Sequence, residues 1–227
     1  MQSEEKAAYG KDLSFAAAEA YRLLRTNVLF ALPDEKKCRI IGITSASSGE
    51  GKSTTALNLA YMLAEAGERV LLIEGDMRLP TISARLNLRY SPGLSNVLVG
   101  LCEVEDVVQE SGFHEGLQVI SSGDIPPNPS ELLGMKKIQE LMACLSAQYD
   151  FIVIDLPPVT EVSDPLIASK LTDGMIVVVR QSYAKRRALA DAMQQLRYAD
   201  AKVLGFVLAR AGTSPGKKYY KRYKREA

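Results

Sequence analysis

Gly51, Lys52 and Ser53 follow one another at the end of a segment rich in small residues. The apolar run from Arg39 predicts a β-strand, and a helix is expected to begin at Lys52. A strand, a glycine-rich turn and a helix N-terminus direct several backbone N–H groups to one point, where they can bind phosphate. The spacing matches the phosphate loop G-x-x-x-x-G-K-[ST], or Walker A motif, in which the lysine contacts the β- and γ-phosphates and the hydroxyl contacts Mg²⁺. Ala46 replaces the first glycine of that pattern.

Two further apolar runs end in carboxylates. Residues 69–74 are typical of a buried strand that closes on Glu74, and Asp76 and Arg78 follow it. A second such run ends in Asp155, and an apolar strand that ends in aspartate is the Walker B pattern, whose carboxylate holds Mg²⁺ directly or through water. Open α/β sheets bind ligands at the carboxyl ends of their strands. We therefore expect these acidic residues beside the phosphate loop.

The elements that must position these groups alternate between strand and helix. Apolar periodicity predicts helices at 15–30, 55–66, 94–99, 103–111, 129–147, 164–171 and 183–198, and further strands at 117–121, 151–155, 175–179 and 203–208. Such alternation predicts an α/β fold with a doubly wound, mainly parallel sheet in a three-layer sandwich. The length of 227 residues and the apolar content of 47% fit one globular domain, placed at 15–212.

Composition excludes several classes of protein. The net charge of +1 gives no overall attraction for nucleic acid. The three cysteines are scattered and there is a single histidine, which argues against a disulfide framework and against a zinc site. We therefore expect a cytosolic chain. The sequence has no run of about 18 apolar residues and no apolar core of a signal peptide, so work at a membrane would need another chain as anchor.

The two ends of the chain differ in character from the core. Residues 1–14 are polar and are predicted to be a flexible segment. In residues 213–227, Tyr219, Tyr220 and Tyr223 lie among basic residues, which predicts a mobile tail. The tail could accept phosphate on its tyrosines, or it could be a basic patch for anionic lipid or nucleic acid.

Three charged residues of the first predicted helix, Glu19, Arg22 and Arg25, recur at intervals of three. Such spacing brings their side chains along one face, where they could pair with a neighbouring molecule or simply face solvent.

Several motifs together resemble the bacterial tyrosine kinases (BY-kinases) of capsular and exopolysaccharide operons. They are the loop SASSGEGKST, the motif LLIEGDMR, the strand FIVID followed by two prolines, and the loop PPNPSELL. The Glu19, Arg22 and Arg25 helix and the tyrosine tail also match that family, and the resemblance covers nearly all of residues 15–223. The implied fold is that of P-loop NTPases related to MinD-like and ParA-like ATPases.

The resemblance implies an ATP-dependent tyrosine kinase that uses Mg²⁺. Backbone amides would cradle the phosphates along a loop comprising Ser48, Gly49, Glu50, Gly51, Lys52, Ser53 and Thr54. Lys52 would bridge the β- and γ-phosphates, while Ser53, Asp76 and Asp155 would organise Mg²⁺. Asp76 or Glu74 is the candidate base for the tyrosine phenol, whose ordinary pKa is about 10.

The family also implies partners and a location. The chain is expected to be the cytoplasmic kinase subunit of a split system, recruited to the inner face of the membrane by a transmembrane polysaccharide co-polymerase that activates it. A ring-like homo-oligomer formed through Glu19, Arg22 and Arg25 would phosphorylate the tail tyrosines in trans. A cognate phosphotyrosine phosphatase is the expected counterpart, and no specific nucleic acid is expected.

Three residues depart from the family pattern: Glu74 replaces an aspartate, Leu156 a small hydroxyl residue, and Ala209 an asparagine near the adenine. Two other functions remain open. A partitioning or positioning ATPase of the same fold would usually carry an additional lysine where Ser47 stands. A regulator that binds nucleotide without transferring phosphate remains compatible with Glu74.

Overall fold

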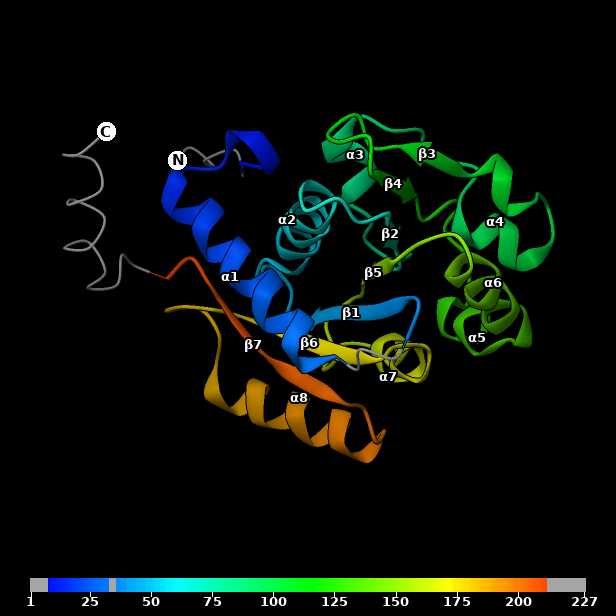
Figure 1. Ribbon diagram of the computed structural model, residues 1–227. Helices are drawn as coiled ribbons and strands as arrows, with labels where there is room; N and C mark the ends of the chain where they lie inside the picture. Colours follow the sequence, from blue (N-terminus) through cyan, green and yellow to red (C-terminus); the bar gives the residue numbers. More distant parts are fainter. Residues whose placement is uncertain (1–7, 33–35, 212–227) are drawn as a thin grey trace, which may run out of the picture.

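The computed structural model describes residues 8–32 and 36–211, which form a seven-stranded sheet with helices on both faces (Figure 1). The strands lie in the order β3-β4-β2-β5-β1-β6-β7, and all neighbours are parallel except the antiparallel pair β3 and β4. The predicted doubly wound, mainly parallel sheet is therefore confirmed. The strands are β1 Arg39–Ser45, β2 Val70–Glu74, β3 Val108–Glu110, β4 Leu117–Ile120, β5 Phe151–Asp155, β6 Gly174–Arg180 and β7 Val203–Ala209.

Helices fill the connections between these strands. They are α1 Phe15–Ala31, α2 Lys52–Glu65, α3 Ile82–Leu86, α4 Leu94–Val99, α5 Pro129–Gly134, α6 Lys136–Ser146, α7 Asp164–Ala168 and α8 Arg186–Tyr198, with 3₁₀ turns η1 Gly10–Asp12, η2 Val104–Asp106 and η3 Ser169–Leu171. No helix in the described part of the chain is long and apolar enough to cross a membrane.

Two hydrophobic cores lie on opposite faces of the sheet. One joins α1, α2 and α3 to side chains such as Ile43 and Val153, and the other joins α4 to α8 to side chains such as Ile152 and Ile154. Figure 1 shows α2 to the left of β2 and β5 and α5 and α6 to the right of these strands. Successive residues of β5 point to opposite faces, which is why a strand covered on both sides is apolar throughout.

Strand register brings the predicted functional segments together. Asp155 at the end of β5 is paired with Ile43 of β1 on one side and with Glu74 of β2 on the other. The loops that follow these three strands therefore leave the sheet at one edge, beside the N-terminus of α2.

Two predicted helices are wrong in detail. Residues 103–111 hold only the turn η2 and then β3, because Val108 to Glu110 pair with the edge of β4 and this pairing overrides the helical pattern. The helix predicted at 129–147 is split, since Met135 is extended (φ −70°, ψ 153°) directly after Gly134, a poor helix former. The predicted helix at 94–99 is confirmed as α4.

Candidate active site

The loop between β1 and α2 has the backbone of a phosphate cradle. Gly49 and Gly51 have φ angles of 77° and 99°, which residues with a side chain rarely adopt. The buried carboxylate of Glu50 accepts hydrogen bonds from the N–H of Ser47 (2.9 Å) and of Arg180 (3.2 Å). The Glu50 side chain thus holds the loop against β6, and its backbone N–H remains part of the predicted cradle.

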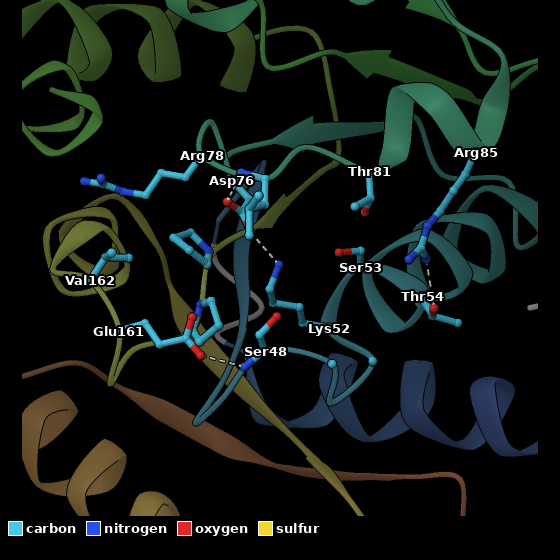
Figure 2. A pocket seen from close by; sticks show the side chains of 15 residues that line it. Ser48, Lys52, Ser53, Thr54, Asp76, Arg78, Thr81, Arg85, Glu161 and Val162 are labelled. Carbon is cyan, nitrogen blue, oxygen red and sulfur yellow. Dashed lines mark hydrogen bonds and ion pairs between the residues drawn. The ribbon is translucent and has the colours of Figure 1, made fainter. Parts of the chain in front are cut away.

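Lys52 forms a buried ion pair with Asp76. Its Nζ lies 2.7 Å from Asp76 Oδ2, and the other oxygen of Asp76 accepts the N–H of Leu79 at 3.0 Å (Figure 2). Burial alone would lower the pKa of Lys52, but the carboxylates of Asp155 and Asp76 outweigh this and raise it. Lys52 is therefore held in its charged form at the first turn of α2, ready to bind phosphate oxygens.

Asp155 is buried at the end of β5, beside Glu74 of β2. Burial raises its pKa to about 6, while Lys52 and a hydrogen bond from Ser53 oppose that rise and the neighbouring carboxylates of Asp76 and Glu74 add to it. Within residues 8–32 and 36–211, Asp155 Oδ1 has no hydrogen-bond partner. A buried oxygen without a partner is costly to the fold, so this atom is suited to a cation.

Glu74 is fully buried and both of its oxygens are used. Oε1 accepts the N–H of Ile82 at 2.5 Å, and Oε2 accepts the N–H of Ser122 at 3.3 Å. The carboxylate therefore links the end of β2 to the start of α3 and to the loop after β4. Between the two predicted candidates for the base, this geometry favours Asp76.

A pocket of about 400 Å³ opens above the loop. It is lined by Ser48, Gly49, Gly51, Lys52, Ser53, Thr54, Asp76, Arg78, Leu79, Thr81, Arg85, Pro157, Pro158, Glu161 and Val162. Figure 2 shows Glu161 at its lower rim, where the carboxylate accepts the N–H of Ser48 at 2.8 Å. One N–H of the predicted phosphate cradle thus already binds an anionic oxygen.

The donors at this site fit Mg²⁺. Ser53, Asp76 and Asp155 offer only oxygen atoms, which this hard cation prefers. No group of three or more His, Cys, Asp and Glu side chains in the described ranges could hold a metal ion by itself. Mg²⁺ in proteins is usually bound by one or two carboxylates together with substrate phosphates.

Comparison with known proteins gives concordant results. A family profile described as an AAA domain matches residues 38–202. The tyrosine-protein kinase YwqD of Bacillus subtilis is 40% identical over 191 residues, covering 84% of this chain and 80% of the relative. The tyrosine-protein kinase CpsD of Streptococcus agalactiae is 34% identical, covering 86% and 83%. The solved kinase domain of the Escherichia coli tyrosine kinase ETK superposes with a TM-score of 0.80 at 32% identity, covering 87% of this chain and 78% of that one.

The chain belongs to the bacterial tyrosine kinases. Its kinase relatives imply that it binds a nucleotide, and the pocket above the phosphate loop is the candidate nucleotide site of this BY-kinase domain. In this BY-kinase the predicted Walker A segment, the LLIEGDMR segment and the Walker B segment meet at one edge of the sheet, as their strand register requires.

Two arginines of this BY-kinase site have fixed partners: Arg78, which the sequence places after Glu74 and Asp76, and Arg85, which the sequence did not single out. Arg78 forms two hydrogen bonds with buried Asp164 of α7 (2.9 and 3.1 Å) and one with Ser130 of α5 (3.2 Å), and the bond to Asp164 raises its pKa. Arg85 of α3 donates to Thr54 Oγ1 at 3.0 Å. The sequence offered two weak signals: Asp164, a carboxylate soon after Pro157–Pro158, and Arg85, a cation on a short helix. Neither residue has a fixed spacing from the phosphate loop, so neither could be assigned to the site from the sequence.

The predicted oligomer-interface residues of the BY-kinase contact its own chain. Arg22 binds Glu19 of α1 (2.5 Å) and Glu65 of α2 (3.4 Å), and Arg25 donates to the carbonyl of Met62 at 2.9 Å. These bonds fasten α1 to α2. Assembly through this face would therefore use those atoms of the three side chains that remain accessible. Alternatively, bonds to a neighbouring copy would replace these bonds within the chain.

The structure describes part of the N-terminal segment of the BY-kinase but not its tail tyrosines. The segment 8–14, within the stretch predicted to be flexible, contains η1, whose Gly10 N–H donates to Asn58 Oδ1 of α2 at 3.0 Å. Tyr219, Tyr220 and Tyr223 lie outside the described residues.

Proposed function

We propose that this kinase transfers the γ-phosphoryl group of ATP to Tyr219, Tyr220 and Tyr223 of a neighbouring copy, and that it does so with Mg²⁺. The observation that supports this most directly is the charged Lys52 held 2.7 Å from Asp76 at the first turn of α2, directly after the glycine-rich loop. A lysine in this place can bridge two phosphates, and a carboxylate beside it can face the attacking group.

Binding of the triphosphate would rearrange two contacts of the nucleotide-free site. The backbone N–H of Ser48 would exchange Glu161 for a phosphate oxygen, and Lys52 would turn from Asp76 to the β- and γ-phosphates. Mg²⁺, when bound beside Ser53 and Asp155, supplies neutralisation of the charge that develops on the phosphate oxygens.

The acceptor phenol needs to lose its proton as it attacks. We assign this role to Asp76, because the departure of Lys52 would free one of its oxygens while the N–H of Leu79 keeps the carboxylate in place. Glu74 would act by positioning α3, since both of its oxygens bind backbone N–H groups. Catalysis would then depend chiefly on positioning and charge neutralisation.

Regulation would follow from the charge of the tail. Each phosphotyrosine adds roughly 1.5 to 2 negative charges, so three of them would largely cancel the positive charge of residues 217–225. We propose that a ring held by the Glu19, Arg22 and Arg25 face loosens as the tails are phosphorylated. A transmembrane adaptor would hold the kinase at the inner face of the membrane, where it would regulate capsular or exopolysaccharide synthesis and export, and a phosphatase would reset the tails.

The test combines a site variant with a mixing experiment. After incubation with Mg-ATP, phosphopeptide mass mapping should find label on the three tail tyrosines of the wild type and of Lys136→Met, an exposed control on α6. Lys52→Met should lose the label while its melting temperature shows a folded chain. Label on Lys52→Met at the wild-type level would contradict the site assignment.

For transfer between copies, the Lys52→Met chain is mixed with an active chain in which Tyr219, Tyr220 and Tyr223 are Phe. Label should then appear on the tail of the Lys52→Met chain, which cannot phosphorylate itself. A tail that stays unlabelled in this mixture would exclude transfer in trans.

A further inference from the structure

Two buried side-chain oxygens lack a hydrogen-bond partner within residues 8–32 and 36–211: Asp155 Oδ1 and Thr81 Oγ1. Both belong to the nucleotide site, since Asp155 ends the Walker B strand and Thr81 lines the pocket above the phosphate loop. Because a buried hydroxyl without a partner destabilises the fold, its retention indicates a partner that arrives with the ligand.

The position of Thr81 in the chain makes its free hydroxyl unusual. Thr81 directly precedes α3, where a threonine side chain ordinarily accepts an N–H from the first turn of the helix, but here it makes no such bond. The carboxylate of Glu74 accepts the N–H of Ile82 instead. Glu74 thus takes over part of the capping of α3, and the Thr81 hydroxyl is left to face the pocket.

The surroundings of Thr81 identify the chemistry that it can serve. Figure 2 shows its side chain directed toward Ser53, with Asp76 to the left of it and Arg85 to the right in this view. Asp155, at the end of β5, is buried close enough to Ser53 and Asp76 for both to influence its pKa. These oxygen groups suit a hydrated cation, whereas the N–H groups and Lys52 that suit phosphate come from the loop and the first turn of α2.

We propose that Thr81 is a positioning residue for Mg²⁺, its hydroxyl oxygen accepting a hydrogen bond from a water ligand of the ion. The proposal rests on the proposed Mg-ATP site. Mg²⁺ dehydrates reluctantly and keeps several waters, and the loss of a group that orients a metal's ligands typically lowers metal affinity about 10- to 100-fold. Glu74 caps α3, and this leaves the Thr81 hydroxyl free of a capping bond. Ser53 faces that hydroxyl.

The test measures how strongly Mg²⁺ and ADP bind together, without any turnover. Fluorescent ADP is titrated into the full chain in EDTA and at a series of Mg²⁺ concentrations. Thr81→Val keeps the branched shape and removes the oxygen, and it should raise the Mg²⁺ concentration at half-maximal coupling by about 10-fold. Its affinity for ADP in EDTA should equal that of the wild type, and Thr81→Ser should restore the coupling.

Melting temperatures of the nucleotide-free variants provide a second readout. Thr81→Val should not lower the melting temperature, because it removes a buried oxygen that has no partner. The matched control Thr172→Val removes a hydroxyl that donates to the carbonyl of Ser169 at 3.0 Å beside η3, and it should lower the melting temperature while leaving Mg²⁺ coupling unchanged.

Three results would overturn the proposal. Thr81→Val could couple Mg²⁺ and ADP as the wild type does. Thr81→Val could weaken ADP binding equally with and without Mg²⁺, which would mean that the hydroxyl contacts the nucleotide itself. A wild type without Mg²⁺-dependent ADP binding would remove the proposed function along with this inference, whereas the first two results leave that function intact.

Discussion

Replacement of Asp155 by Asn should make the nucleotide-free protein more stable at neutral pH. Asp155 has a pKa of about 6 in the folded chain against an ordinary value of 3.8, mainly because burial disfavours the charged carboxylate. A folded pKa above the unfolded one means that the protonated group contributes stability at low pH and that this contribution is lost as the pH rises through about 6.

The size of the effect follows from the shift. Roughly two pKa units correspond to about 3 kcal/mol, so at pH 7.5 the ionised carboxylate should destabilise the empty fold by up to about 3 kcal/mol relative to a neutral side chain of the same shape. Asp155 titrates in both the folded and the unfolded chain, so at pH 5 the destabilisation should already have reached about half of its full value. The stability advantage of Asp155→Asn should therefore grow by about 1.4 kcal/mol between pH 5 and pH 7.5.

Urea denaturation of both chains at pH 5, 6, 7 and 8 measures this difference. Asp150→Asn is a control of opposite sign: the bond to Arg69 lowers the pKa of Asp150, so its loss should destabilise the fold, and by nearly the same amount at every pH from 5 to 8, because the carboxyl is ionised in both states there. Mg-ADP should stabilise the wild type more than Asp155→Asn. If Asp155→Asn were the less stable chain at pH 7.5, or if its advantage ignored pH, the argument that Asp155 is an uncompensated buried charge would fail.

Two further changes address the nucleotide cradle and the assembly. Glu161→Gln should tighten ADP binding by roughly 3- to 10-fold in calorimetry, because the carboxylate that competes for the N–H of Ser48 loses its charge. The control Glu131→Gln on α5 should have no effect. Equal ADP affinities in the wild type and Glu161→Gln would contradict this competition. Arg25→Ala breaks the bond to the Met62 carbonyl and should reduce the mass of the assembly in light scattering; an unchanged mass would remove Arg25 from the proposed interface.

The site segments could be predicted because their information is local. The glycines of the loop, the run that ends in Asp155 and the apolar strand before Glu74 are each recognisable within a few residues, and parallel strands bring their carboxyl ends to one edge. The helix at 103–111 failed because pairing with β4, some ten residues away, decides the conformation of Val108 to Glu110.

The roles of individual carboxylates were beyond such reasoning. Glu50, Glu74 and Glu161 are chemically alike, and each lies close to a recognised motif. Only the packing of β6, α3 and the loop after β5 determines that Glu50 holds the loop, Glu74 caps a helix and Glu161 covers an amide of the cradle. The carboxylate of Glu74, one methylene longer than that of the aspartate expected from the family pattern, thus contacts the start of α3 and the loop after β4.

The bond between Lys52 and Asp76 bears on how a carboxylate could serve as base beside a lysine. While Asp76 binds Lys52 at 2.7 Å, one of its oxygens is occupied. A triphosphate that draws Lys52 away would free that oxygen. In the proposed mechanism Asp76 thus becomes a competent base only when the phosphoryl donor is present, which ties deprotonation of the tyrosine to a filled site.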